Sequence, residues 1–180
     1  MTKEIVFAGF GGQGVLTAGL VISQVALYNG LNATWMPSYG PAMRGGTANC
    51  TVKYSSGRIY SPGREQPDVI MALNIPSFNA FIQAVKPGGL MLIDGDIVTC
   101  DTNVRDDVKI VSVPGSSIAT DELKNPKGLN IVMIGAMVKV MGDFTKEDAI
   151  AGMSDMFRKK GKGKFEEANI AAFERGYASV

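Results

Sequence analysis

A glycine-rich turn near the N-terminus is the feature that most constrains how this chain can fold. Residues 9–14 read Gly-Phe-Gly-Gly-Gln-Gly, directly after the apolar residues 5–8 and directly before an apolar stretch at 15–28. This order predicts a buried strand, a tight turn and a helix. In such a turn, glycines let the backbone approach a phosphate group, and the helix N-terminus offers N–H groups that lack partners.

Apolar runs and glycine or proline breaks continue to alternate along the chain, as they do in βα proteins. More strands are expected at residues 33–36, 47–54, 69–73, 90–94 and 110–113. More helices are expected at residues 76–85, 130–141, 146–157 and 165–177. A tight turn at 55–58 predicts that residues 59–60 pair with the strand at 47–54. We therefore expect one α/β domain over residues 1–180, a three-layer Rossmann-like sandwich with a mostly parallel, mixed sheet and a β-hairpin after the second strand.

Composition excludes several kinds of active site. The chain has no histidine and only two cysteines, Cys50 and Cys100. Histidine acid–base catalysis, histidine-ligated metals and Ser-His or Cys-His nucleophile pairs are therefore excluded. Two isolated thiols cannot hold an iron–sulfur cluster alone. We expect both cysteines to be buried, unpaired thiols, and we expect no catalytic residue and no metal ligand in this chain.

Charge and hydropathy exclude further classes of protein. Lys and Arg number 18 against 17 Asp and Glu, a net charge of +1, so no polybasic segment marks a nucleic-acid partner. No apolar run approaches the roughly 18–20 residues of a membrane span. The apolar run after Glu4 is also too short for a signal peptide. We therefore expect a cytoplasmic chain that binds neither nucleic acid nor membrane.

The glycine turn is the first candidate binding site, with Gly9, Gly11, Gly12, Gln13 and Gly14 as its candidate residues. A NAD site would also need an acidic residue roughly 20 residues further on, to hold the ribose hydroxyls. No Asp or Glu occurs between positions 4 and 65, which argues against NAD or FAD. Binding of another phosphate-bearing group and a purely structural tight turn are the alternatives that stay open.

A loop expected at residues 37–46 supplies a second candidate, Arg44. This arginine is the first charged residue after Glu4, and two glycines follow it. A lone arginine in a loop at the carboxyl end of a strand suits an anion. Tyr39 and Met43 add apolar bulk, so we expect residues 38–46 to be buried against a partner chain or a second copy.

Several stretches of the sequence together match the pattern of one known family. They are the glycine turn with Val15, then Ser38-Tyr39-Gly40-Pro41, Met43-Arg44-Gly45-Gly46-Thr47-Ala48-Asn49-Cys50, residues 130–136, residues 169–173, Gly176 and Tyr177. With these residues the chain resembles the gamma subunit of the 2-oxoacid:ferredoxin oxidoreductases over nearly its whole length. One departure is Ala42, where the family pattern leads us to expect a glutamate. That departure leaves Arg44 without a nearby carboxylate partner.

The resemblance implies a multi-subunit enzyme that oxidatively decarboxylates a 2-oxoacid and couples it to coenzyme A. The products would be an acyl-CoA, CO2 and reduced ferredoxin. The resemblance also implies thiamine diphosphate between alpha and beta subunits and iron–sulfur clusters on other chains. This chain would then hold no cofactor and be inactive alone, with alpha, beta and delta (ferredoxin-like) subunits as partners. The form Met-Arg-Gly-Gly-Thr-Ala-Asn favours 2-oxoglutarate over branched-chain 2-oxoacids, pyruvate or indolepyruvate.

Three functions stay open at this point. The chain is a gamma subunit whose glycine turn and Arg44 contribute to a coenzyme A site, a stand-alone Rossmann-like nucleotide-binding protein, or an assembly scaffold that binds no ligand. The missing acid and the missing histidine argue against the second function. Nothing in the sequence separates the first from the third.

Overall fold

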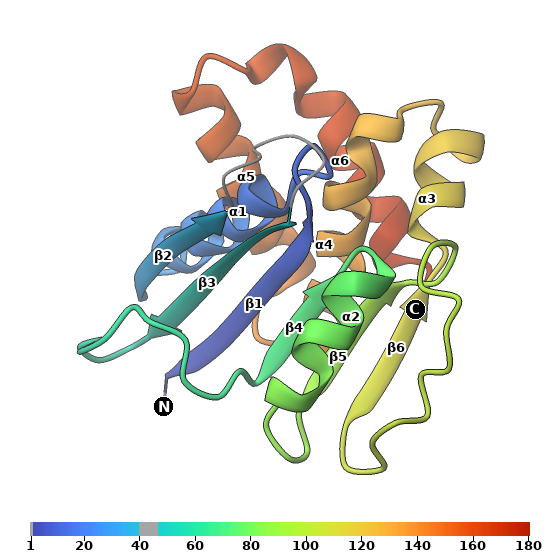
Figure 1. Cartoon of the computed structure of the whole chain (residues 1–180). Helices are drawn as coiled ribbons and strands as arrows, with labels where there is room; N and C mark the ends of the chain where they lie inside the picture. Colours follow the sequence, from blue (N-terminus) through green and yellow to red (C-terminus); the bar gives the residue numbers. More distant parts are fainter. Residues whose placement is uncertain (1, 40–46) are drawn as a thin grey trace.

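A six-stranded sheet with the strand order β2-β3-β1-β4-β5-β6 forms the centre of the structure (Figure 1). The computed structural model describes residues 2–39 and 47–180. The strands are β1 (Lys3–Phe10), β2 (Asn32–Tyr39), β3 (Thr47–Ser55), β4 (Val69–Ala72), β5 (Leu90–Asp94) and β6 (Lys109–Val113). Strands β1, β4, β5 and β6 run parallel to their neighbours in that series, and β3 runs antiparallel to β1 and β2. The expected α/β fold with a mixed sheet is confirmed.

Helices cover both faces of this sheet (Figure 1). The longer helices are α1 (Val15–Tyr28), α2 (Ile75–Phe81), α4 (Leu129–Met141), α5 (Lys146–Lys159) and α6 (Glu166–Tyr177). Ile5 and Phe7 of β1 pack with α1 and α4 on one face, while Val6 and Ala8 pack with α2 on the other. A strand buried on both faces has a continuous apolar sequence rather than an alternating one, which is why residues 5–8 can be recognised as a central strand.

The hairpin differs from the expected one. Strand β3 pairs with β2 along its whole length, from Asn32 opposite Ser55 to Tyr39 opposite Ala48, so the hairpin connection is 40–46. Residues 59–60 lie outside the sheet because β1 and β2 already occupy both edges of β3. Strand β2 also continues past the expected residue 36 and includes Pro37. It tolerates this proline because it is an edge strand.

Short helical turns between β6 and α4 were not expected from the sequence. They are α3 (Gly115–Ser117), a π-helical turn (Ile118–Glu122) and a 3-10 turn (Pro126–Gly128). The buried carboxylate of Asp94, at the end of β5, accepts hydrogen bonds from the backbone N–H (3.2 Å) and the hydroxyl (2.5 Å) of Ser116. A buried carboxylate that receives donors from a turn fixes that turn in place. The sequence pattern of 114–128 carries no helical period long enough to show this.

Helices α4 and α6 pack unusually closely. A Cβ atom added at Gly135 would collide with the carbonyl oxygen of Phe173, and one added at Gly176 would collide with the carbonyl oxygen of Val132. These glycines therefore let two helix backbones touch.

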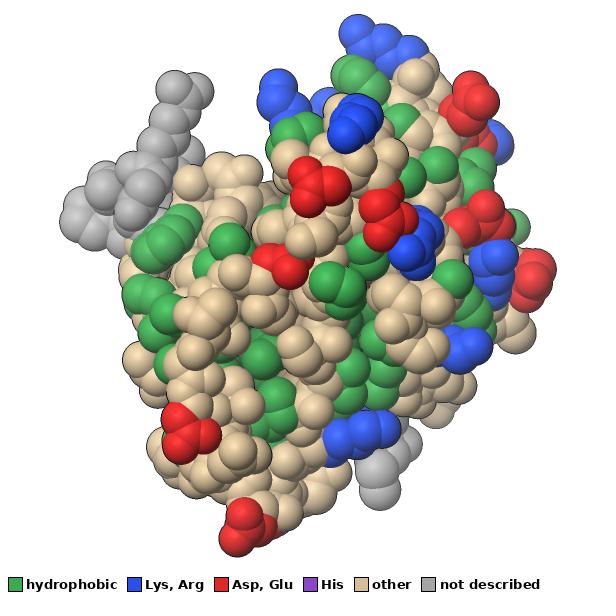
Figure 2. Space-filling model, turned by 90° about the vertical axis from the view of Figure 1, so that its right-hand side faces the viewer, with side chains coloured by type: hydrophobic (Ala, Val, Ile, Leu, Met, Phe, Trp, Pro, Cys, Tyr) green, Lys and Arg blue, Asp and Glu red, His purple; other side chains and the backbone are tan. Residues whose placement is uncertain are grey.

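On the face drawn in Figure 2, Lys and Arg side chains are interspersed with Asp and Glu side chains. Among the described residues, no helix combines the length and apolar character needed to cross a membrane.

Candidate functional site

The glycine turn adopts a backbone that only glycine accepts readily. Gly12 has φ +105° and Gly14 has φ +77°, both in the left-handed region. Gly14 is the N-cap of α1, and the N–H of Gln13 closes the turn on the carbonyl of Phe10 at 3.1 Å. A Cβ added at Gly12 would meet nothing within 4 Å, so this residue faces open space. Gly12 is exposed and Gly9 is buried, which separates the outer part of the turn from its packed base.

Gln13 holds the turn onto the sheet. Its Oε1 accepts from the backbone N–H of Phe10 (2.7 Å) and from Nδ2 of Asn74 (3.0 Å), and its Nε2 donates to the carbonyl of Leu73 (3.1 Å). Asn74 in turn caps α2 by accepting from the N–H of Ser77. The Gln13 amide therefore joins the turn to the carboxyl end of β4. What the turn presents outward is its backbone.

Gly9 and Gly14 are needed for close packing. A Cβ at Gly9 would lie 2.7 Å from Cγ1 of Val15 and 2.8 Å from Oε1 of Gln13. A Cβ at Gly14 would lie 2.7 Å from Nδ2 of Asn130, which donates to the Gly14 carbonyl at 3.2 Å. The structural explanation of the turn therefore fits Gly9 and Gly14, while Gly12 faces outward and Gly11 is partly exposed.

The N-terminus of α1, next to the glycine turn, has backbone N–H donors without a partner inside the helix. The first intrahelical hydrogen bond runs from the N–H of Ala18 to the carbonyl of Gly14. The N–H groups of residues 15–17, in the first turn of the helix, therefore have no helical partner. Within the described residues no side chain caps α1, whereas Asn74 caps α2 and Thr145 caps α5. An uncapped helix start with the positive end of the helix dipole favours an anion.

A pocket of about 580 Å³ opens on one side of the turn. Its walls come from the turn, from the start of α4 and from the connection between α5 and α6. The lining residues described are Gly12, Gln13, Gly14, Thr17, Asn125, Pro126, Lys127, Leu129, Asn130, Ile131, Phe157, Lys162, Phe165, Ala168 and Asn169. This lining contains two lysines and no acidic residue. Lys127 and Lys162 are not predictable from the sequence, because they lie more than 100 positions after the turn and belong to no recognisable motif.

The two lysines are exposed, and neither forms an ion pair in the described part of the chain. Phe165 adds an apolar surface at the pocket, with 49% of its area exposed. The Nδ2 of Asn169 is buried and has no hydrogen-bond partner among the described residues. Positive charge, free donors and an exposed aromatic ring together suit a phosphate-bearing ligand with a flat group.

A second hollow of about 210 Å³ adjoins the turn and shares Gly12, Gly14 and Thr17 with the first; Gly11 and Ala48 also line it. Both ends of the segment 40–46 lie near this hollow, at the end of the sheet where β1 stops and β3 begins. Thr47 pairs with Phe10, and the backbone of Tyr39 pairs with Ala48. Arg44, Met43, Ala42 and the side chain of Tyr39 lie outside the described residues, so their expected roles stay predictions. The strand pairing does bring both ends of the segment 40–46 to the same end of the sheet as the glycine turn.

The sheet order also bears on the NAD alternative. In a dinucleotide-binding fold, the strand after the first helix lies directly beside the first strand, and the acid at its end reaches the ribose. Here β3 is inserted between β1 and β2. The end of β2 is therefore one strand further from the turn, and the sequence Ser38-Tyr39 stands there instead of an acid.

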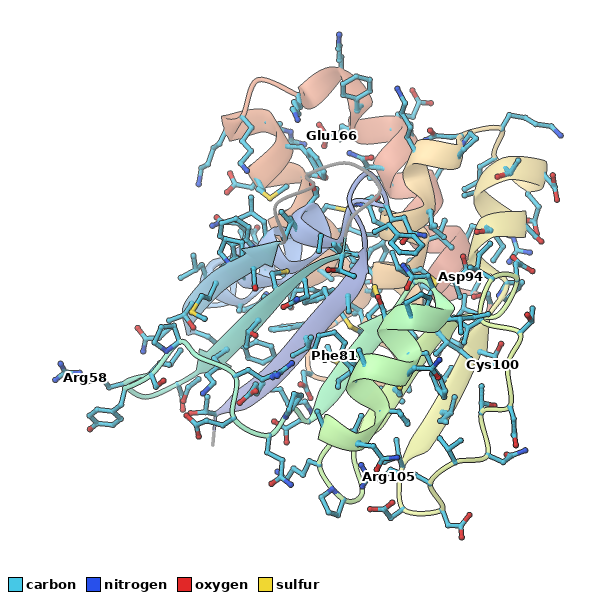
Figure 3. All side chains as sticks on the ribbon, viewed as in Figure 1. Arg58, Phe81, Asp94, Cys100, Arg105 and Glu166 are labelled. Atoms are coloured by element: carbon cyan, nitrogen blue, oxygen red, sulfur yellow. The ribbon has the colours of Figure 1, made fainter. Side chains whose placement is uncertain are left out.

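The cysteines occupy different environments. Cys50 is fully buried in β3, and burial raises the pKa of its thiol to about 12. Cys100 lies in the loop after β5, and β1 separates β5 from the strand that carries Cys50 (Figure 3). Cys100 is half-buried, whereas the sequence predicted a buried thiol. Both are free thiols. Within residues 2–39 and 47–180, no group of three or more Cys, Asp or Glu side chains could hold a metal ion.

The profile of the family described as pyruvate ferredoxin/flavodoxin oxidoreductase matches residues 4–179 of the chain. The chain belongs to this family. Among members of the pyruvate ferredoxin/flavodoxin oxidoreductase family, the 2-oxoglutarate synthase subunit KorC of Methanocaldococcus jannaschii is 35% identical over 178 residues, which cover 98% of this chain and 93% of the relative. The ketoisovalerate oxidoreductase subunit VorA of Methanothermobacter marburgensis is 35% identical over 177 residues, 96% of this chain and 35% of the relative.

Solved structures of the family have the same fold. The gamma subunit of a keto/oxoacid ferredoxin oxidoreductase from Geobacter sulfurreducens superposes with a TM-score of 0.83 at 30% identity, covering 98% of this chain and 97% of that one. The 2-oxoglutarate:ferredoxin oxidoreductase of Magnetococcus marinus, solved with 2-oxoglutarate, coenzyme A and succinyl-CoA, gives 0.85 at 26% identity, covering 98% of this chain and 30% of that one. This chain thus spans about a third of that protein and of VorA. The resemblance to gamma subunits is confirmed.

Proposed function

We propose that this gamma-type subunit supplies part of the coenzyme A site of a 2-oxoacid:ferredoxin oxidoreductase. The observation that carries the proposal is the pocket beside Gly12, which combines an uncapped helix start with Lys127 and Lys162 and contains no acid among its described lining residues. Coenzyme A is rich in phosphate, and each phosphate oxygen is a strong acceptor for N–H donors. The Magnetococcus relative, whose structure contains coenzyme A, supports this choice of ligand.

In this proposal the chain binds and orients coenzyme A, while bond making and breaking occur on partner subunits. The overall reaction joins the acyl group of the 2-oxoacid to the coenzyme A sulfur, releases CO2 and passes two electrons to ferredoxin. Thiamine diphosphate and iron–sulfur clusters are proposed for the alpha, beta and delta subunits. Backbone N–H groups at the start of α1 and the two lysines hold phosphate oxygens, and Arg44 is proposed to add a further contact from the segment 40–46.

We also propose 2-oxoglutarate as the 2-oxoacid. The sequence around Arg44 favours it, and the KorC relative is the subunit of a 2-oxoglutarate synthase. The VorA relative, equally identical to this chain, makes branched-chain 2-oxoacids the second candidate.

The test is to purify the enzyme assembled on a tagged copy of this chain and to measure ferredoxin reduction with each 2-oxoacid, with and without coenzyme A. The expected result is coenzyme A-dependent reduction with the highest kcat/KM for 2-oxoglutarate. A higher kcat/KM for another 2-oxoacid would overturn the substrate, and reduction that does not need coenzyme A would overturn the site.

A further inference from the structure

One tyrosine on a protruding loop stands out from the rest of the surface. Tyr60 is 88% exposed, the largest fraction among the exposed large hydrophobic residues described. It lies in residues 56–64, here called the arm, which leaves the end of β3 and projects beyond the sheet (Figure 1). Arg58, whose side chain points away from the body of the molecule in Figure 3, stacks over the Tyr60 ring with its guanidinium 5.5 Å from the ring centre.

The arm has a well-fixed base. The N–H of Gly57 donates to Oγ of Ser55 at 3.1 Å, and Nδ2 of Asn32 donates to the Gly57 carbonyl at 3.0 Å. Near its other end, Arg64 stacks over the ring of Phe81 in α2 at 5.0 Å. The two ends of the arm are therefore attached to the sheet and to α2, while its tip carries an exposed aromatic ring that Arg58 contacts.

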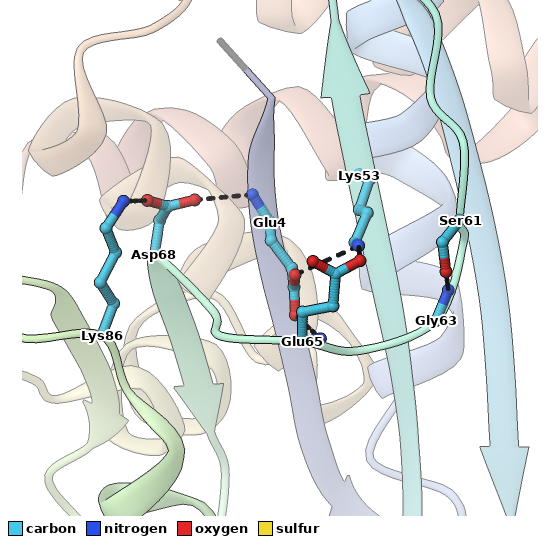
Figure 4. A network of polar contacts seen from close by, with 7 residues as sticks. All are labelled: Glu4, Lys53, Ser61, Gly63, Glu65, Asp68 and Lys86. Carbon is cyan, nitrogen blue, oxygen red and sulfur yellow. Dashed lines mark hydrogen bonds and ion pairs between the residues drawn. The ribbon is translucent and has the colours of Figure 1, made fainter.

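A buried ion pair, Lys53–Glu4, and the exposed carboxylate of Glu65 together secure the chain directly after the arm (Figure 4). Lys53 of β3 is only 4% exposed, and its Nζ lies 2.8 Å from Oε1 of Glu65 and 3.4 Å from Oε2 of Glu4. The N–H of Glu65 donates to Oε1 of Glu4 at 2.9 Å. Buried ion pairs lose much of their attraction to desolvation, so their best-attested role is to specify a position. Here the position specified is that of the arm's base.

We propose that the arm is a pre-organised docking element that inserts Tyr60 and Arg58 into an apolar pocket bordered by carboxylates on another subunit of the same enzyme. Tyrosine and arginine are the residue types that dominate binding hot spots. A loop already held in place loses little conformational freedom on binding. The arm carries Arg58 and Arg64 and no acid, so a negatively charged partner surface complements it.

A second copy of this chain fits the arm poorly. If the two-fold axis of a dimer passed through the arm, Arg58 of each copy would lie close to the other, and among the described residues no patch opposite the arm pairs an apolar pocket with a ring of carboxylates. The proposal rests on the proposed function only in requiring a multi-subunit enzyme. The arm does not touch the coenzyme A pocket, because β3 runs about 26 Å from Thr47 at the glycine turn to Ser55 at the arm.

The test compares Tyr60→Ser and Arg58→Ser with two matched controls, Tyr28→Ser and Lys124→Ser, in the assembled enzyme. Tyr28 is 53% exposed, and Lys124 is exposed without an ion pair in the described residues. Sedimentation velocity over a dilution series gives the apparent Kd of this chain for the rest of the enzyme. We expect the apparent Kd to rise about 30-fold for Tyr60→Ser and about 5-fold for Arg58→Ser. The Kd of the Arg58→Ser variant should also depend less on salt concentration, because a charge has been removed. The controls should stay within twofold, and so should the KM for coenzyme A of the complex that still forms.

Equal, less than twofold effects in all four variants would overturn the proposal. So would an intact enzyme accompanied by loss of a homodimer of the isolated chain in Tyr60→Ser, since that outcome assigns the arm to a second copy. Weakened assembly in an enzyme that proves independent of coenzyme A would refute the proposed function and still support the arm.

Discussion

Nδ2 of Asn130 donates to the carbonyl oxygen of Gly14 at 3.2 Å and joins two helix starts that are 116 residues apart in sequence. Asn130 is buried in the first turn of α4, and Gly14 is the N-cap of α1. The Asn130 amide occupies the space that a Cβ on Gly14 would need. Position 14 must therefore be a glycine to leave room for the Asn130 amide, and the hydrogen bond between the two residues fixes one wall of the pocket.

Replacing Asn130 tests this connection. Asn130→Ala removes one buried hydrogen bond and should lower the free energy of unfolding by about 1 kcal/mol. Asn130→Asp places a carboxylate against the Gly14 carbonyl oxygen and should cost clearly more. Urea denaturation of the two variants measures the difference. An aspartate variant as stable as the alanine variant would show that the donor contact has no role.

The contact between α4 and α6 predicts large losses for very small substitutions. Gly135→Ala and Gly176→Ala each place a methyl group against a backbone carbonyl of the other helix, so the helices must separate. We expect each change to lower the free energy of unfolding by about 3 kcal/mol. Gly163→Ala is the matched control, because its nearest neighbour is 3.7 Å away and its φ lies outside the left-handed region. Thermal and urea unfolding should show the control within about 0.5 kcal/mol of the unchanged chain.

Much of the fold follows from local sequence. Residues 5–8, 69–72 and 90–94 read as central strands because both faces are buried, and the three long C-terminal helices lie within two residues of their expected bounds. The hairpin partner of β3 differs from the expected one because strand pairing depends on tertiary contacts as well as on the local sequence. The short run at 59–60 follows a turn signal, but both edges of β3 are already filled. The turn at 115–117 is held by the buried Asp94, a contact that local sequence does not show.

The candidate site was predictable only in part. The glycine turn was visible because its six residues are contiguous and follow a strand. The pocket's other walls come from Lys127, Lys162 and Asn169, which only the folding of α4, α5 and α6 brings to the turn. The role of Gln13 was also hidden, since its partners Asn74 and Leu73 lie about 60 residues away.

The buried thiol of Cys50 predicts a selective chemical reaction. With its pKa raised to about 12 by burial, Cys50 should react with iodoacetamide at pH 8 about 1,000-fold more slowly than an ordinary thiol. Mass spectrometry of the native protein should find the label on Cys100, and labelling in urea should modify both. Early labelling of Cys50 in the native protein would contradict its position in the core.

The same pKa shift gives a pH dependence of stability. The unfolded thiol loses its proton near pH 8.5, whereas the folded thiol keeps it until about pH 12. The folded state therefore binds more protons in this window, so the free energy of unfolding should fall as the pH rises through it. Cys50→Ala lacks this contribution and should lose less stability between pH 8.5 and 10.5. Parallel curves for the two proteins would show that the thiol does not titrate as expected.

Arg44 gives a prediction that rests on the sequence and on the position of its segment's ends beside the glycine turn. If it contacts a phosphate of coenzyme A, Arg44→Ala should raise the KM for coenzyme A by about 10- to 150-fold, the equivalent of one charge-assisted contact of roughly 1.5–3 kcal/mol. Stability should hardly change. A KM within twofold of the unchanged enzyme would remove Arg44 from the site.

The most direct test of the account is the KM for coenzyme A of the assembled enzyme that carries Lys127→Ala and Lys162→Ala together. Each exposed lysine contact with a phosphate is worth about 0.5–1 kcal/mol, so the double variant should raise this KM by about 5- to 30-fold and leave kcat and the KM for the 2-oxoacid nearly unchanged. Lys160→Ala, on the same connection but outside the pocket lining, is the control and should have no effect. A KM for coenzyme A that stays within twofold in the double variant, or that rises equally in the control, would contradict the assignment of this pocket to coenzyme A.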